Sequence, residues 1–258
     1  MTRVVGHIDL DYFYAQVEEV EDPSLKSRPV MVYVFSGRTE DSGAVATANY
    51  RAREYGVRSG MPIAQAKKAL VGKDPAVIRM DHTKYETISS RIMETVEQTV
   101  DTLEPTGIDE AFFDITSSIE GDYSRARGVA ETIKKSIFDS ERLTSSIGIG
   151  RSKVVAKVGS DFAKPNGLTI VIPEATESFL SPLPVARLYG VGPKTTGVLG
   201  EMGVGSVGEL AKVPPSELER HFGRKFAGYL LAAANGTDDG PVVGGLEPTQ
   251  FSRIVTLK

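Results

Sequence analysis

Hydrophobic and polar positions alternate along the chain in short runs that predict strands and helices in close succession. Apolar residues at 4–10 and 29–35 predict two strands, and residues 14–20 between them suit a helix whose Glu18 and Glu19 face water. Catalytic residues are often found at such a junction between a strand and a helix.

The middle of the chain continues this mixture of helices and strands. Residues 86–100 are amphipathic at helical spacing. The other expected elements are, in chain order, a polar loop at 38–43, helical segments at 46–54 and 61–70, a strand at 111–115, a helix at 126–140 and a strand at 144–149. This order implies two αβ crossings over a mixed sheet, which is typical of an α+β fold.

The last third of the chain has a different pattern, with frequent glycine and proline. Several short helices are expected over residues 174–234, and they predict a separate all-α module. Residues 237–247 are rich in Gly, Asp and Pro and indicate a linker, and residues 253–258 resemble a strand with nothing to pair with. A chain of 258 residues is also long enough for more than one domain.

Composition narrows the kinds of site that the chain can hold. Hydrophobic residues make up 40% and charged residues 25%, which is ordinary globular usage. There is no cysteine, and His7, His82 and His221 are widely separated, so any metal must be held by oxygen. There is no signal peptide and no apolar run of about 18 residues, so we expect a soluble, cytoplasmic protein without a membrane segment.

Charge is unevenly distributed along the chain. The formal net charge of −4 argues against strong nucleic-acid binding by the chain as a whole. Arg151, Lys153, Lys157 and Lys164 nevertheless form a basic run within an acidic stretch. We therefore expect a site with an acidic centre and a basic rim.

Acidic residues stand at the ends of two predicted strands. In the segment HIDLD at residues 7–11, the strand period of two places Asp9 and Asp11 on one face. Asp109 and Glu110 precede a later apolar strand, and pairing of adjacent strands would bring them near Asp9. Carboxylates without histidine or cysteine select a hard cation such as Mg²⁺, which suits phosphoryl or nucleotidyl transfer. Taken alone, the pattern fits a catalytic metal site and solvated or ion-paired acids equally well.

Four segments together resemble the Y-family translesion DNA polymerases, in particular the archaeal polymerase IV branch. They are IDLDYFYAQVE at residues 8–18, SGAVATANY at 42–50, IDEA at 108–111 and AKPNG at 163–167. Their order and spacing agree with the family over the whole chain. The resemblance implies an enzyme of DNA repair and translesion synthesis that extends a primer from deoxynucleoside triphosphates with low fidelity and without proofreading.

The family architecture divides this chain into parts. The resemblance implies a palm at residues 1–10 and 77–170, with a mixed β-sheet and packed helices, and a small fingers insert at 11–76. It also implies an all-α helix-hairpin-helix thumb at 171–236 and a linker at 237–258. In the family this linker leads to a basic little finger domain. We expect the chain to lack that domain, which would account for its acidic balance.

The resemblance also assigns the metal ligands. It implies two Mg²⁺ ions, which Mn²⁺ could replace, bridged by Asp9 and Asp109. Glu110 would hold the ion at the primer end, and the backbone carbonyl of Leu10 would complete the ion at the nucleotide. Asp11 is then not a ligand. In this scheme one ion activates the primer 3′-hydroxyl and the other neutralises the triphosphate.

Other matching positions surround the nucleotide in the family. Tyr14 corresponds to the steric gate, whose ring would clash with a ribose 2′-hydroxyl. The residues implied to contact the incoming nucleotide are Tyr12 and Phe13 through their N–H groups, Tyr14, Thr47, Tyr50, Arg53 and Lys164. Those implied to contact the nascent base pair are Val34, Ala44, Ala46, Gly60 and Met80. The small side chains among them would press weakly on the shape of the pair, so low fidelity is expected.

One position departs from the family pattern. Gly107 stands where the family usually has serine before Ile-Asp-Glu. A hydroxyl that could orient a carboxylate or the primer end is missing. We therefore expect an effect on the rate rather than a loss of activity.

The segment LYGVGPKT at residues 188–195 resembles a helix-hairpin-helix, with an apolar helix end before the hairpin. Glycine lets the backbone approach a phosphate, and the following helix start offers free N–H groups irrespective of base sequence. Gly190, Val191, Gly192 and Lys194 are the implied DNA contacts. An ordinary helical corner with a glycine C-cap is the alternative.

Two other functions remain open at the level of sequence. A haloacid-dehalogenase-type phosphohydrolase would use Asp9 as nucleophile and Asp11 as general acid, although Phe13 stands where that class has Thr or Val. A non-enzymatic DNA-binding protein would use only the hairpin. On the preferred interpretation the partners are primer-template DNA, a deoxynucleoside triphosphate and, for the intact protein, a sliding clamp, and the chain is a monomer.

Overall fold

The chain folds into two compact units, each with its own sheet. The computed structural model describes residues 1–37, 39, 41–238 and 240–245. Among the described residues, the first unit comprises 1–9, 95–136 and 145–245, and the second comprises 10–94 and 137–144. No helix of the described ranges is both long and apolar enough to cross a membrane.

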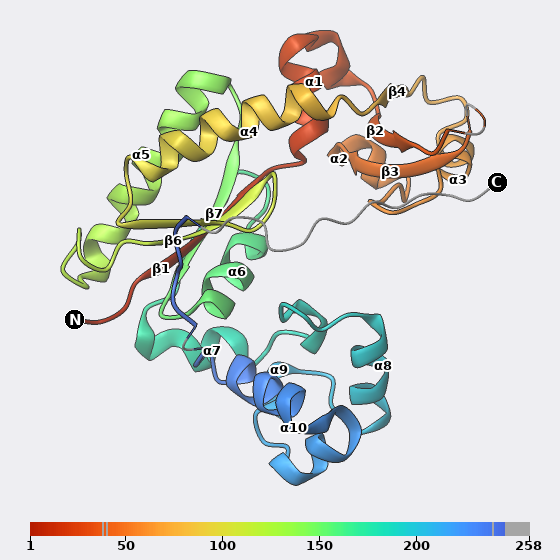
Figure 1. The fold of residues 1–258 in the computed structure, drawn as a ribbon. Coiled ribbons are helices and arrows are strands. Elements are labelled where there is room, and N and C mark those ends of the chain that lie inside the picture. Colours follow the sequence, from red (N-terminus) through yellow and green to blue (C-terminus); the bar gives the residue numbers. More distant parts are fainter. Residues whose placement is uncertain (38, 40, 239, 246–258) are drawn as a thin grey trace. The chain divides into compact units, whose positions relative to one another are not determined.

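A five-stranded sheet forms the centre of the first unit (Figure 1). Its strand order is β5-β6-β1-β7-β8. β1 (Val5–Leu10) pairs antiparallel with β6 (Glu110–Asp114), and β6 pairs antiparallel with β5 (Thr102–Pro105). β7 (Ser145–Gly150) and β8 (Leu168–Ile170) run parallel to each other. The predicted mixed sheet is therefore confirmed.

Glycine allows unusually close packing on both sides of this sheet. Every residue of β1 is buried, and a Cβ on Gly6 would overlap the ring of Phe113. A Cβ on Gly148 in β7 would overlap backbone atoms of Ala156 and Ser160 in the helix α6 (Lys153–Phe162). The backbone of α6 consequently lies directly against β7.

Short helices follow β8, as the sequence predicts. They are η2 (Pro173–Ala175), α7 (Thr176–Leu180), η3 (Val185–Arg187), α8 (Pro193–Glu201), α9 (Val207–Leu210) and α10 (Pro215–Ala234). Their buried side chains, such as Leu199 and Leu230, form one hydrophobic cluster with Val155 and Val158 of α6. This core joins the all-α segment to the helix that covers the sheet.

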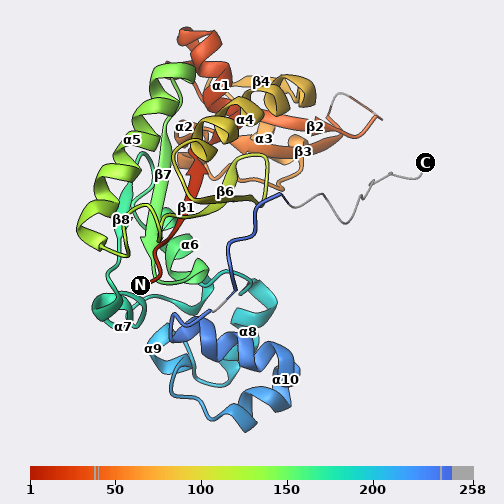
Figure 2. The ribbon, with the colours of Figure 1, turned by 60° about the vertical axis from the view of Figure 1, so that its left-hand side comes forward.

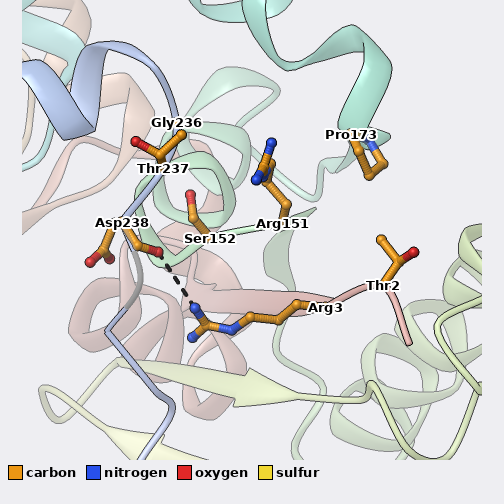
Figure 3. Close-up of a pocket in the computed structure, with 8 residues that line it drawn as sticks. All are labelled: Thr2, Arg3, Arg151, Ser152, Pro173, Gly236, Thr237 and Asp238. Carbon is orange, nitrogen blue, oxygen red and sulfur yellow. Dashed lines mark hydrogen bonds between the residues drawn. The ribbon is translucent and has the colours of Figure 1, made fainter.

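The segment after α10 returns to the sheet of the same unit (Figure 2). Arg3 donates hydrogen bonds to the carbonyl oxygens of Asp238, at 3.4 Å, and of Gly240, and the Val243 N–H donates to Glu104 Oε2 at 2.7 Å. Where it passes the start of α6 it borders a cavity of about 340 Å³ (Figure 3). The cavity is lined by Thr2, Arg3, Arg151, Ser152, Pro173, Gly236, Thr237 and Asp238. Residues 239 and 246–258 of the expected linker lie outside the described residues.

The second unit contains a three-stranded sheet in the order β3-β2-β4. β2 (Val30–Phe35) pairs antiparallel with β3 (Gly43–Ala48) and parallel with β4 (Ala76–Arg79). Side chains of this sheet share a core with α2 (Tyr50–Glu54) and α3 (Ile63–Ala69). The remaining elements are α1 (Phe13–Glu21), η1 (Pro23–Ser27), α4 (His82–Glu97) and α5 (Tyr123–Glu141), of which α4 and α5 pass from one unit into the other.

The predicted helix at residues 46–54 is wrong in its first part. Residues 43–48 form β3, and α2 begins only after the Asn49 cap, whose side chain accepts a hydrogen bond from the Ala52 N–H at 2.9 Å. Alanine-rich composition favours a helix, but backbone pairing with β2 overrides that propensity. The three- and four-residue strands β4, β5 and β8 were not predicted, because they are too short to show a period.

The expectation that Glu18 and Glu19 face water is also wrong. They are only 9% and 6% exposed. Glu18 accepts hydrogen bonds from Lys84 and Tyr85, and Glu19 accepts one from Asn49 at 2.8 Å. These donors come from segments distant in sequence, so the charge pattern of the helix alone could not reveal them.

Replacement of Gly148 tests the close approach of α6 to β7. Because the new methyl group would overlap backbone rather than flexible side chain, Gly148→Ala is expected to lower the free energy of unfolding by about 3 kcal/mol. The matched control is Gly128→Ala on the exposed side of α5, where no atom lies within 4 Å of the new Cβ. It should stabilise the protein by about 0.5 kcal/mol. Urea unfolding followed by circular dichroism measures both, and equal stabilities would contradict the packing.

Candidate active site

The pairing of β1 with β6 gathers the acidic residues. In the antiparallel register Asp9 is the direct partner of Glu110, and Asp109 is the residue immediately before β6. Side chains of directly opposed residues have their Cβ atoms about 4.5–5.5 Å apart. Asp9 is 9% exposed, so this concentration of negative charge is largely withdrawn from water.

Two ammonium groups lie among these carboxylates. Lys164 Nζ is 2.7 Å from Asp9 Oδ2 and 2.7 Å from Asp161 Oδ1. Lys157 Nζ makes a close ion pair with Glu110 Oε2 and lies 3.8 Å from Asp9 Oδ2. The basic run noted in the sequence therefore reaches the acidic centre, rather than only its rim, because α6 packs directly over the sheet.

Burial shifts the proton affinities of these groups. Desolvation raises the pKa of Asp9 to about 6 even though Lys164 and Lys157 act to lower it. Burial and the neighbouring Glu110 raise the pKa of the Asp109 carboxyl. Burial alone would lower the pKa of Lys164, but Asp9 and Asp161 outweigh it and raise the pKa above its usual value. Lys164 therefore keeps its positive charge firmly, whereas Asp9 and Asp109 lose their protons less readily than ordinary carboxyl groups.

His7 lies behind these residues on β1 and is fully buried. Burial, with Lys157 and Lys164 nearby, lowers the pKa of its imidazole well below the usual value, so the ring is neutral. Ser160 Oγ donates to the Lys157 carbonyl at 2.8 Å, which leaves it to accept from His7 Nδ1 at 2.8 Å. Within the described part of the chain, His7 Nε2 has no hydrogen-bond partner; it lies 3.8 Å from Glu110 Oε2, and because the ring is neutral this contact is not a salt bridge.

The donor atoms suit a hard divalent cation. Asp9, Asp109 and Glu110 offer only oxygen, and they converge on one end of the β1/β6 pair. Among the described residues, however, no three His, Cys, Asp or Glu side chains are arranged as a ready metal-binding group. Lys157 and Lys164 now make the ionic contacts of Asp9 and Glu110. The three carboxylates therefore fit a metal site by residue type, while in the structure Asp9 and Glu110 are paired with lysine ammonium groups.

Asp11 has a different environment from Asp9, although the strand period predicts both side chains on the same face. Its N–H donates to the Thr144 carbonyl at 3.1 Å, and its Oδ2 accepts from Thr144 Oγ1 at 2.8 Å. Asp11 is fully buried. A buried carboxylate with such partners serves structure, which favours the resemblance-based exclusion of Asp11 from the ligands.

The backbone at Gly107 forms a tight turn before β6. The N–H groups of Thr106 and Gly107 both donate to the Glu110 carbonyl, at 3.1 and 3.2 Å. A Cβ at Gly107 would lie 3.2 Å from Glu110 Cγ, so a serine there would press on that carboxylate. Thr106 Oγ1 lies 3.4 Å from Glu110 Oε1 and supplies a hydroxyl next to the position where the sequence lacks one.

Aromatic and cationic groups gather at the start of α2 in the second unit. The Arg53 guanidinium carbon lies 4.9 Å from the centre of the Tyr50 ring, and the rings of Tyr12 and Tyr50 are 5.2 Å apart. Arg53 Nε donates to the Ala48 carbonyl at 2.9 Å, which fixes the guanidinium. Tyr12, Tyr50 and Arg53, which are assigned to the nucleotide, thus lie together, while Lys164 belongs to the first unit.

Tyr14 packs against aromatic rings of the same unit. Its ring centre is 4.5 Å from that of Tyr85 and 5.4 Å from that of Phe13. Tyr14 is half-buried, whereas Phe13 is fully buried. Tyr14 is therefore the more accessible of these two neighbouring aromatic residues.

Of the residues assigned to the nascent base pair, Val34, Ala44 and Ala46 lie on strands β2 and β3, and Gly60 and Met80 lie outside the strands but donate hydrogen bonds to them. Val34 of β2 is 44% exposed and opposes Ala44 of β3. Thr47 pairs with Val32, the Gly60 N–H donates to Val45, and the Met80 N–H donates to Tyr33, while Ala46 is half-buried on β3. One face of the β2/β3 hairpin thus presents small side chains.

The hairpin at residues 189–193 has the backbone that its glycines suggest. Gly190 adopts φ 77°, a conformation that favours glycine, and Gly192 precedes α8 with Pro193 at its first position. Lys194 is exposed, whereas Val191 is buried, with 6% of its surface exposed. The segment before the hairpin is the 3₁₀ helix η3 rather than the expected α-helix end, so the detail of a helix-hairpin-helix is not established.

The sequence analysis placed Lys157 only in the basic rim of the site and gave His7 no role. Lys153 and Lys157 are four residues apart on one face of α6, a helix that was not predicted, and which strand that face meets is decided by tertiary packing. The period of β1 likewise put His7 on the side of Asp9 without showing that α6 covers it.

The raised pKa of Asp9 leads to a pH-dependent prediction. Its folded value of about 6 exceeds the ordinary 3.8, so its contribution to stability is present below pH 3.8 and is lost as the pH rises through about 6. In metal-free protein, Asp9→Asn should therefore raise the free energy of unfolding at pH 7.5 by about 2 kcal/mol and change little near pH 4. Urea unfolding in EDTA measures this, and a variant less stable than wild type at pH 7.5 would contradict it.

Comparison with known proteins identifies the family. Residues 8–161 match the impB/mucB/samB (IMS) family. The chain is 46% identical over 259 residues to DNA polymerase IV of Nitrosopumilus maritimus, covering 100% of this chain and 71% of that protein. It is 39% identical over 255 residues to DNA polymerase IV of Saccharolobus solfataricus, covering 99% of this chain and 71% of the relative.

Solved structures agree with the sequence comparison. A crystal structure of DinB from Sulfolobus solfataricus has a TM-score of 0.86 at 37% identity, covering 93% of this chain and 69% of that one. An insertion ternary complex of Dbh DNA polymerase has a TM-score of 0.86 at 38% identity with the same coverage, 93% and 69%. With these matches, the resemblance carried by the four sequence segments is confirmed, and the chain belongs to the impB/mucB/samB family of Y-family DNA polymerases.

Proposed function

We propose that the chain catalyses template-directed transfer of a nucleotide from a deoxynucleoside triphosphate to a primer 3′-hydroxyl, as a low-fidelity translesion DNA polymerase. The observation that carries this proposal is the pairing of Asp9 with Glu110 beside Asp109, with Lys157 and Lys164 among them. The family match over residues 8–161 supports it. A phosphohydrolase using Asp9 and Asp11, or a protein that only binds DNA, has no such support.

The three carboxylates are proposed to hold Mg²⁺. Asp9 and Asp109 would bridge two ions, Glu110 would bind the one at the primer end and the Leu10 carbonyl the one at the nucleotide. When bound, the ions supply Lewis-acid activation of the 3′-hydroxyl and neutralise the phosphate charge, and Mn²⁺ is a possible substitute. The antiparallel β1/β6 register keeps the backbone positions of these three residues in a fixed relation.

Other residues are proposed to bind and orient the nucleotide. Tyr50 and Arg53 suit the triphosphate oxygens, and the backbone N–H groups of Tyr12 and Phe13 at the start of α1 favour an anion. Thr47 is proposed to contact the same ligand. Lys164 would exchange its contact with Asp9 for a phosphate oxygen.

The remaining assignments follow the family architecture. We propose a palm at residues 1–10 and 77–170, fingers at 11–76 and a thumb at 171–236. Val34, Ala44, Ala46, Gly60 and Met80 would contact the nascent base pair, and their mostly small side chains would tolerate mispairs. In the thumb, the backbone at residues 190–192 and the exposed Lys194 would contact DNA phosphates. A monomer recruited by a sliding clamp is the proposed working form of the intact protein.

Primer extension tests the chemistry. With Mg²⁺, primer-template DNA and each deoxynucleoside triphosphate, Asp109→Ala is expected to reduce the extension rate by about a thousandfold or more, because a carboxylate at the reaction centre is lost. The matched control is Asp11→Asn, whose side chain contacts Thr144, and its effect should be far smaller. Equal loss in both variants would contradict the exclusion of Asp11 from the metal ligands, and no extension by wild-type protein would overturn the proposal.

Replacement of Tyr14 tests the steric gate. Tyr14→Ala should raise incorporation of ribonucleotides relative to deoxynucleotides by about a hundredfold, because the ring that would exclude the 2′-hydroxyl is removed. The control Tyr85→Phe keeps the aromatic contact with Tyr14 and should leave this ratio unchanged. Competitive single-nucleotide insertion measures the ratio, and unchanged discrimination in Tyr14→Ala would exclude the assignment.

A further inference from the structure

Lys157 is a residue of the site to which the proposed reaction gives no role. It lies on α6 one turn after Lys153, and its ammonium is directed at the ends of β1 and β6. Ser160, one turn further along, donates its hydroxyl to the Lys157 carbonyl at 2.8 Å. The backbone that carries Lys157 is also held against β7 by the close contact at Gly148. The ammonium is therefore supported by a rigid part of the first unit.

The charges around Lys157 distinguish it from Lys164. Lys164 divides its contacts between Asp9 and Asp161, and Asp161 belongs to the same helix as Lys157. Lys157 is shared between Asp9 and Glu110, the two carboxylates that face each other across the strand pair. The side chains of Lys157 and Asp9 are each 13% exposed, and that of Glu110 is 25% exposed. Water screens this ion pair only weakly.

We propose that Lys157 is an intramolecular counter-cation of the Asp9–Glu110 pair, which holds the two carboxylates in place without a metal and which a divalent ion must displace. This inference rests on the proposed function, in which these carboxylates bind the metal. Two opposed carboxylates at this depth repel each other unless a positive charge lies between them. The ammonium supplies that charge, so the site stays assembled when no ion is bound.

The same contact has a cost for metal binding. A divalent ion that enters between Asp9 and Glu110 must break the Lys157 contact and tolerate the nearby ammonium, so Lys157 weakens its affinity. Substitution of Lys157 should consequently change the metal-free and metal-bound protein in opposite directions. The metal-free protein loses stability, and the ion binds more tightly. A residue that only binds substrate would cause neither change.

Lys153 provides a matched control on the same helix. Its ammonium binds both carboxylate oxygens of Glu104, at 2.7 and 2.6 Å, and its side chain is 17% exposed, close to the 13% of Lys157. Glu104 also accepts a hydrogen bond from the Val243 N–H. Lys153→Met therefore removes an equally buried ion pair that does not involve Asp9, Asp109 or Glu110.

The experiment measures binding of Mn²⁺ alone, without DNA or nucleotide. After removal of metal with EDTA and exchange into buffer, free Mn²⁺ is titrated by electron paramagnetic resonance, and the melting temperature is recorded with and without the ion. Lys157→Met is expected to bind Mn²⁺ about tenfold more tightly than wild type. Its metal-free melting temperature should fall by about 5 °C relative to wild type. Addition of Mn²⁺ should raise the melting temperature of the variant by more than it raises that of wild type.

Three further variants separate the possible results. Lys153→Met should lower the melting temperature by a similar amount but leave the Mn²⁺ dissociation constant unchanged. Lys157→Arg, which keeps the charge, should resemble wild type in that constant. Asp109→Ala should lose Mn²⁺ affinity. If Lys157→Met does not unfold cooperatively, Lys157→Gln, which retains a hydrogen-bond donor, is used for the same titration.

The outcomes for the inference and for the proposed function differ. If wild type binds Mn²⁺ through Asp109 but Lys157→Met and Lys157→Gln bind it equally or more weakly, the counter-cation role is wrong and the proposed function stands. Tighter binding by Lys153→Met as well would also overturn the role, because the effect would then be one of general charge. If wild type shows no Asp109-dependent binding of Mn²⁺, the proposed metal site fails and the inference fails with it.

Discussion

The antiparallel register of β1 with β6 is the constraint on which the candidate active site depends. It makes Asp9 the direct partner of Glu110 and leaves Asp109 at the adjacent turn, so three carboxylates from two distant segments share one end of a strand pair. A shift by one residue would turn Asp9 to the opposite face. The hydrogen-bonded turn at Thr106 and Gly107, where both N–H groups donate to the Glu110 carbonyl, holds the register at this end.

Such a concentration of acid is tolerated because α6 brings positive charge to it. Gly148 lets the helix backbone approach β7, and this approach places Lys157 against Glu110 and Asp9. Burial still raises the pKa of Asp9 to about 6, so the compensation is incomplete. A site that remains short of positive charge favours binding of an added cation. The uncompensated negative charge lowers the stability of the protein without that cation. Packing and chemistry are thus linked through one helix–strand contact.

The second unit combines a hydrophobic core with a network of buried polar contacts. Asn49 caps α2, donates to Glu19 and accepts from the Val30 N–H, so a single amide joins helix, strand and a buried acid. The cap sets where α2 begins and therefore where Tyr50 and Arg53 project. Because each of these groups would be costly to bury alone, the network specifies one arrangement.

The sequence alone determined the features that depend on local pattern and on residue chemistry. The strand at β1, the helices α4 and α5, the exclusion of cysteine and histidine ligands and the acids Asp9, Asp109 and Glu110 could all be read from it, and the four family segments specified the kind of protein. The tertiary structure decided the rest. Residues 43–48 became a strand because β2 offers them backbone partners, and Glu18 and Glu19 became buried because Lys84, Tyr85 and Asn49 meet them. The position of Lys157 between Asp9 and Glu110 was also decided by the tertiary structure. The partner of a charged side chain depends on which surfaces pack together, and the local periodicity of a sequence does not specify that packing.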